Sequence, residues 1–202
     1  MGNFVGNAVS VEYAPLTVLT SGGALPGAVL NVRDTAQFPA TGTVNIGTNI
    51  VNYTAKTATT FTGCTGGTVA VAANDRVVGA YQAFTAYLKD PSISVKIGTA
   101  ENSHQNDTWK RFLPGMGEAS MKMTVLYEDI TFTLLPQGWL NSMKRKIVAW
   151  RLRERGSGVG LPEALFDAML TGLNEKYSAG NEIVSAEVDM QVDGQPVYAA
   201  QV

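Results

Sequence analysis

Three segments in the second half of the sequence alternate between apolar and polar residues, and they restrict the fold more than any other feature. Residues 92–97, 120–127 and 183–192 each place apolar side chains at every second position. This two-residue repeat is typical of a β-strand with one buried and one exposed face. Three such strands have to bury their apolar faces together, so the sequence predicts a mainly β fold.

The first 80 residues differ in composition from the rest of the chain. Before Gly79 they are rich in Gly, Thr, Ala and Val, and their only charged residues are Glu12, Arg33, Asp34, Lys56, Asp75 and Arg76. Short runs of β-favouring residues are separated by turn residues, at 28–32, 42–46, 50–54, 59–62 and 76–78. We therefore predict an N-terminal arm over 1–15, a small all-β insert over 16–80 and a larger β domain over 81–202.

Several segments of the larger domain are less decisive. Apolar residues at helical spacing predict one short helix over 131–143. Residues 165–177 fit a helix and a strand equally well, and periodicity leaves both open. Residues 98–118 are polar and Gly-rich and predict a long loop, which in a compact domain is usually functional. A strand is expected at 146–153 and a turn at 193–196.

The residue inventory argues against an enzyme. Cys64 is the only cysteine and His104 the only histidine, so a thiolate or histidine metal site within one chain is not expected. No combination of nucleophile, base and orienting group has a recognised spacing, so we expect no catalytic residues, no metal and no cofactor. The formal net charge is -2, which gives no basic footprint for specific nucleic-acid binding. No apolar run approaches the roughly 18–20 residues of a membrane-spanning helix, so no membrane insertion is expected.

Three stretches resemble the major tail (tail tube) proteins of long-tailed bacteriophages, and a fourth resembles a different phage element. Residues 108–121 (TWKRFLPGMGEASM) are similar to the loop that enters a strand in that family, and residues 165–171 (LFDAMLT) to a late strand. Residues 178–196 resemble the closing strand with its Gly-x-Pro ending. Residues 38–68 resemble a small β repeat of phage structural proteins, which a minimal tube subunit lacks.

The resemblance implies a β-sandwich or partial barrel with one short helix, plus the small all-β insert near the N-terminus. It also implies that residues 165–177 form a strand. It further implies a structural subunit that polymerises with itself as stacked, hexameric rings around a channel for DNA. The partners would be copies of the chain, other tail proteins at the tube ends, and viral DNA that passes without specific binding. The expected location is the virion tail, after assembly in the host cytoplasm.

Two groups of residues are candidates for these contacts. Within 98–118, Trp109, Arg111, Phe112 and Pro114 are expected to reach a neighbouring subunit, because aromatic and Arg side chains dominate interface energetics. The polar face of 183–192 has no cation and would suit a channel wall that repels DNA, and its residues are Ser185, Glu187, Asp189 and Gln191. The alternative function is a carbohydrate- or receptor-binding β-sandwich module.

Overall fold

The computed structural model describes residues 9–25, 27–83, 88–103, 108–127, 146–153, 158–176 and 184–201. The chain divides into two compact units, one made of Met1–Val11 with Phe84–Val202 and the other of Glu12–Ala83. Ten strand pairs among the described residues are antiparallel. The predicted mainly β fold is confirmed, while the helix predicted over 131–143 lies outside the described residues.

The largest sheet has seven strands in the order β10-β11-β14-β13-β12-β1-β9. Its strands are β1 (Ser10–Ala14), β9 (Gln82–Ala83), β10 (Leu88–Glu101), β11 (Phe112–Tyr127), β12 (Ile147–Arg153), β13 (Pro162–Lys176) and β14 (Val184–Ala200). The strands predicted at 92–97, 120–127, 146–153 and 183–192 are therefore confirmed. The ambiguous segment 165–177 lies in β13 as far as Lys176, where the described residues end, and pairing with β12 and β14 decides in favour of a strand.

One face of this sheet is buried by the alternation that the sequence predicted. Along β13, Ala164, Phe166, Ala168 and Leu170 are buried at every second position. The β12 partners of Ala164, Phe166 and Ala168 are also buried, and Trp150 is the one that stands opposite Phe166. The rest of this buried set comes from the neighbouring strands: Ala119, Met121, Met123, Val148, Leu152, Val188, Met190 and Val192.

Two predictions for the larger domain are wrong. Residues 98–118 are not one long loop, because β10 continues to Glu101 and β11 begins at Phe112. The segment contains Gly and Pro, but pairing between its two halves satisfies the backbone that a loop would leave exposed. Residues 193–196 are not a turn, because β14 runs on through them. Between the pairs Leu165–Val197 and Asp167–Asp193, β14 advances four residues while β13 advances two. Gly194, with φ 83°, therefore lies in an irregularity of the register with two extra residues on β14.

The Glu12–Ala83 unit contains two smaller sheets. The four-stranded sheet has the order β2-β8-β4-β5 and the three-stranded sheet the order β3-β7-β6. Their strands are β2 (Leu16–Val18), β3 (Val29–Asn31), β4 (Gly42–Ile46), β5 (Asn49–Tyr53), β6 (Ala55–Lys56), β7 (Thr60–Thr62) and β8 (Arg76–Gly79). The short strands predicted in this part of the sequence are confirmed.

The core of this unit is apolar and includes three aromatic rings. The ring of Phe61 lies 5.0 Å from that of Phe38 and 4.5 Å from that of Tyr53, measured between centroids. Aliphatic side chains complete the core: Leu19, Leu30, Val32, Val44, Ile46, Val51, Val71 and Val77. The unit therefore has a hydrophobic core of its own.

Candidate assembly surfaces

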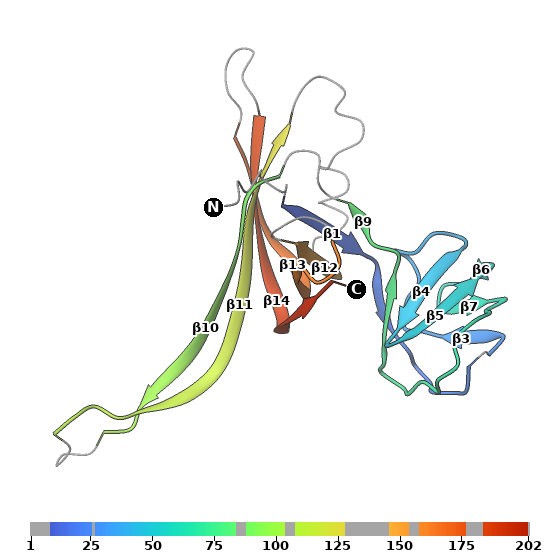
Figure 1. Ribbon diagram of the computed structural model, residues 1–202, viewed down its shortest axis with the longest axis horizontal. Helices are drawn as coiled ribbons and strands as arrows, with labels where there is room; N and C mark the ends of the chain where they lie inside the picture. Colours follow the sequence, from blue (N-terminus) through green and yellow to red (C-terminus); the bar gives the residue numbers. More distant parts are fainter. Residues whose placement is uncertain are drawn as a thin grey trace. The chain divides into compact units, whose positions relative to one another are not determined.

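The β10–β11 hairpin runs beyond the strands that flank it. β11 pairs with β14 from Ser120 to Tyr127, whereas the part of β11 from Phe112 to Ala119 pairs with β10 alone. Figure 1 shows the two strands curving away together from the rest of the sheet. We call residues 95–119 the hairpin extension; within it, 104–107 are outside the described residues.

Glycines shape the middle of the hairpin extension. The register moves from Ile97 opposite Gly117 to Thr99 opposite Pro114, so β11 carries one extra residue in a β-bulge. A Cβ on Gly115 would lie 3.0 Å from the carbonyl oxygen of Gly98. Gly at both positions therefore lets the two backbones approach closely at the bulge.

The apolar face of the sheet continues onto the hairpin extension, where it is no longer covered. Ile93, Val95 and Ile97 follow one another on the face that carries the buried Met121. Ile93 is half-buried, Val95 is 51% exposed and Ile97 is 66% exposed. An apolar face that begins in the core and ends in solvent is a feature of interaction sites.

More exposed apolar side chains lie toward the end of the hairpin extension. Trp109 is 83% exposed and Met116 is 92% exposed, and Phe112 and Leu113 are each more than half exposed. Phe112 stands opposite Glu101, which shares the face of Ile97 by the two-residue repeat of β10. Large apolar groups are therefore concentrated at this end of one hairpin.

The four residues predicted to contact a neighbour all lie in this part of the hairpin. Trp109 and Arg111 precede β11, Phe112 is its first residue and Pro114 lies opposite Thr99. The backbone NH of Arg111 donates to the Ser103 hydroxyl at 3.0 Å, and its carbonyl accepts from the NH of Asn102 at 2.8 Å. These bonds hold the described part of the tip together while Trp109 remains exposed.

The polar residues of β14 are paired with β11 on one side. Ser185, Glu187, Asp189 and Gln191 stand opposite Leu126, Thr124, Lys122 and Ser120 of β11. The Lys122 ammonium lies 3.3 Å from the Asp189 carboxylate, and the Gln191 amide donates to the carbonyl of Ala119 at 2.9 Å. The residues predicted for a channel wall are thus neighbours along one strand.

This polar face is not free of cations. Lys122 on β11 and Lys96 on β10 share it with Glu187 and Asp189, and Lys96 stands opposite Glu118. The sequence of β14 alone contains no cation, and only the strand register brings these lysines beside it. The alternating pattern of β10 and of β11 predicted that each lysine lies on a polar strand face. That pattern did not predict which strand pairs with which.

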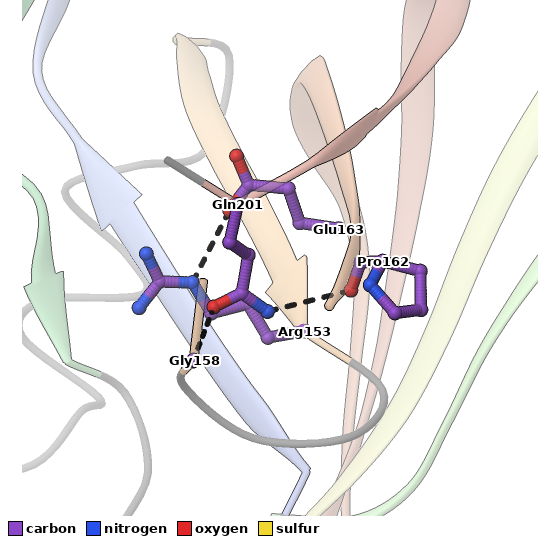
Figure 2. Close-up of polar contacts among 5 residues, drawn as sticks. All are labelled: Arg153, Gly158, Pro162, Glu163 and Gln201. Carbon is purple, nitrogen blue, oxygen red and sulfur yellow. Dashed lines mark hydrogen bonds and ion pairs between the residues drawn. The ribbon is translucent and has the colours of Figure 1, made fainter. Parts of the chain in front are cut away.

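A second polar cluster lies at the beginning of β13 and connects neighbouring segments of the chain (Figure 2). The Arg153 guanidinium lies 3.2 Å from the Glu163 carboxylate, and both side chains are largely buried. The Gln201 side chain accepts from the NH of Gly158 at 2.9 Å and donates to the carbonyl of Pro162 at 3.5 Å. These contacts join the end of β14 to the segment before β13, and they engage Arg153 within the chain.

Among the residues described, no group of three or more His, Cys, Asp or Glu side chains is placed to hold a metal ion. His104 lies outside the described part of the chain. Cys64 is buried, and burial raises the pKa of its thiol, with a smaller opposing effect from a backbone hydrogen bond. No helix in the described ranges is long and apolar enough to cross a membrane.

Comparison with known proteins finds similarities among solved structures. No protein-family model and no curated protein matches this sequence. A chain of the "Virion of native gene transfer agent (GTA) particle" is 17% identical, with a TM-score of 0.46, over 58% of this chain and 89% of that one. A chain of the "Tail of empty GTA particle computed with helical refinement, C6 symmetry" is 18% identical, with a TM-score of 0.46, over 59% and 87%. At this identity and TM-score, neither similarity establishes what this chain does.

Proposed function

We propose that this protein is a non-enzymatic structural subunit of a viral tail tube, which polymerises with itself as stacked, hexameric rings around a DNA channel. The observation that carries the proposal is the uncovered apolar face of the hairpin extension. Its partners are copies of the same chain, other tail proteins at the tube ends, and DNA that passes without specific binding. Its place is the virion tail, and it assembles in the host cytoplasm.

The chemistry of the hairpin extension favours a second copy of the chain as its cover. Val95 and Ile97 extend a face that is buried nearer to the core, so an apolar surface of the same kind completes the layer. Covering apolar area contributes about 25 cal/mol per Å², and a central aromatic contact contributes roughly 2 kcal/mol or more. Trp109 and Phe112 supply the aromatic anchors, and Arg111 supplies a charged group beside them.

The edge of the large sheet gives a second reason for self-assembly. β10 is the terminal strand of the sheet, so one of its two edges has no strand partner among the described residues. A long open edge is a template for pairing with another chain. If each copy pairs this edge with a different surface of the next copy, the contact is head-to-tail. Such a contact closes into a ring when the rotation between copies is a whole fraction of a turn. Strands joined around the ring then form one continuous barrel without edges.

In this arrangement the polar face of β14 lines the channel. Ser185, Glu187, Asp189 and Gln191 contribute hydroxyl, carboxylate and amide groups and no cation of their own. Two carboxylates, those of Glu187 and Asp189, lie on this face, and Lys122 forms an ion pair with Asp189. A wall that repels phosphate lets DNA pass without the salt-dependent affinity that free cations create.

The Glu12–Ala83 unit is not required for ring closure in this proposal. It has its own core, and its composition differs from that of the strands that would form the wall. We place it outside the tube as a separate knob.

Electron microscopy of variants in the hairpin extension tests the proposal. The purified parent protein should form rings or tubes, and Ile97→Ser combined with Phe112→Ser should yield a folded chain that no longer assembles. The matched control is Tyr198→Ser on β14, because Tyr198 is 64% exposed and Ile97 is 66% exposed. A parent that remains a monodisperse monomer, or normal tubes from the double variant, would contradict the proposal.

A further inference from the structure

We propose that a shallow pocket on the Glu12–Ala83 unit binds a single neutral sugar ring of a glycan. The pocket is lined by Asn45, Gly47, Arg76, Val78 and Tyr81. Its volume is about 230 Å³. Pockets for drug-sized ligands hold roughly 300–1,000 Å³, so this one suits one ring rather than a larger molecule.

The strand register explains how the pocket forms. Asn45 on β4 stands opposite Val78 on β8, and the adjacent pair Ile46 and Val77 is buried in the core. Because successive side chains point to opposite faces, Asn45 and Val78 lie together on the outer face of the four-stranded sheet. Arg76 is on this face two residues before Val78, and Tyr81 follows the end of β8.

The lining has the mixture of groups that a sugar needs. Val78 is 9% exposed and provides an apolar floor. The aromatic ring of Tyr81 offers a flat surface for the CH groups of a pyranose, while its hydroxyl is a hydrogen-bonding group. The Asn45 amide provides donors and an acceptor, and the Arg76 guanidinium provides donors only, so hydroxyl groups can be bound from two sides.

Asn45 is the most informative of these residues. It is half-buried, and within the residues described its side-chain amide makes no hydrogen bond. The neighbouring polar side chains on the same face are already engaged, since the Thr43 hydroxyl donates to the Asn52 amide oxygen at 2.7 Å. An amide without a protein partner at the rim of a pocket can form hydrogen bonds with a ligand.

The pocket is chemically distinct from the hairpin extension. The exposed groups of the extension are mainly aliphatic and aromatic, whereas the pocket combines one aromatic ring, one amide and one guanidinium. The unit also contains few charged residues, which favours a neutral ligand over a highly charged one. The inference therefore does not depend on ring formation.

Saturation-transfer NMR on the full chain tests this inference, since it reports weak binding to assemblies of any size. The probes are glucose, galactose, mannose and N-acetylglucosamine. At least one should receive saturation from the parent protein, and Tyr81→Ala should weaken its binding by about tenfold or more. Tyr81→Phe should retain most of the transfer, because the ring remains.

Two further variants keep the test decisive if Tyr81→Ala unfolds. Asn45→Ala should also reduce transfer, since it removes the amide and leaves the buried residues of β4 unchanged. Ile50→Ala is the matched control, because Ile50 is 61% exposed on the neighbouring strand β5 and does not line the pocket. Absence of transfer to all four sugars, or equal transfer in the parent and Asn45→Ala, would overturn the inference.

Discussion

The ammonium of Lys122 on β11 lies 3.3 Å from the carboxylate of Asp189, its direct cross-strand partner on β14. A Cβ on Gly172 of β13 would lie only 3.1 Å from the other side-chain oxygen of Asp189. Asp189 is therefore held between a cation on one neighbouring strand and a residue without a side chain on the other. On the same face, Glu187 stands opposite Thr124 on β11 and Asn174 on β13.

Charge reversal on this face should interfere with DNA passage. Glu187→Lys with Asp189→Lys should allow assembly but slow DNA ejection, most strongly at low salt, where the Debye length is long. Each new phosphate contact should add about 0.9 to the slope of log affinity against log salt concentration. Ejection kinetics from intact variant virions at several salt concentrations provide the measurement.

The matched control exchanges the two partners of the ion pair. Lys122→Asp with Asp189→Lys keeps both the pair and the net charge of the face, so ejection should match that of the parent. Unchanged ejection by the charge-reversed variant, from tails of normal length, would place this face away from the channel.

Excision of the insert should preserve the tube. The register places Glu12 opposite Ala83 and Tyr13 opposite Gln82, so β1 and β9 form a pair whose ends can be joined directly. Replacing residues 16–80 by Asn-Gly leaves the three-residue loop Pro15-Asn-Gly between Ala14 and Tyr81, and therefore retains both strands. We expect tubes of smaller outer diameter in electron micrographs. If rings fail to form with this linker and with a longer Gly linker, the unit belongs to the wall.

Loss of Glu163 should destabilise the large sheet. Glu163→Ala leaves the largely buried Arg153 without its carboxylate partner, and removing one member of a buried pair typically costs about 3–5 kcal/mol. We expect a loss near the lower end of this range in urea unfolding of the dissociated subunit, because Arg153 has a further interaction. Glu118→Ala, on the exposed part of β11, should change the free energy of unfolding by no more than about 0.5 kcal/mol. Equal effects of the two variants would show that the ion pair contributes nothing.

The Glu12–Ala83 unit should lose stability in alkali. Burial raises the pKa of Tyr53 and that of Cys64 above their ordinary values, so the folded unit binds these protons more tightly than the unfolded chain. Their contribution is complete below the ordinary pKa values, about 8.5 for a thiol and 10 for a phenol, and is lost as pH rises through the raised values.

Thermal unfolding followed from neutral pH upward measures this effect. Tyr53→Phe with Cys64→Ala removes both titrating groups and should give a flatter decline above about pH 9. The variant should be less stable at neutral pH, because the Tyr53 hydroxyl donates to the carbonyl of Pro39 at 3.0 Å. Parallel pH profiles for parent and variant would assign the alkaline loss to other groups.

Several features followed from the sequence because their cause is local. Alternation at 183–192 predicted both β14 and its buried face, since side-chain direction in a strand has a period of two residues. Short β-favouring runs separated by turn residues predicted the strands of the Glu12–Ala83 unit, because both signals are also local. The strand at 165–177 was different, because its apolar residues fit either period and only pairing with β12 and β14 decides between them.

Tertiary structure decided the features that depend on partners distant in sequence. Residues 98–118 look like a loop because Gly, Pro and polar residues are locally unfavourable in a strand. They extend β10 and β11 because each half supplies hydrogen-bond partners for the other. Likewise, the polar face of strand 183–192 has no cation in its own sequence. Lys122, which lies more than 60 positions earlier in the chain, forms an ion pair with Asp189 on that face. The alternating sequence pattern determined which strand faces are polar and which are apolar. The strand register, which is a long-range property, determined which charged side chains meet on those faces.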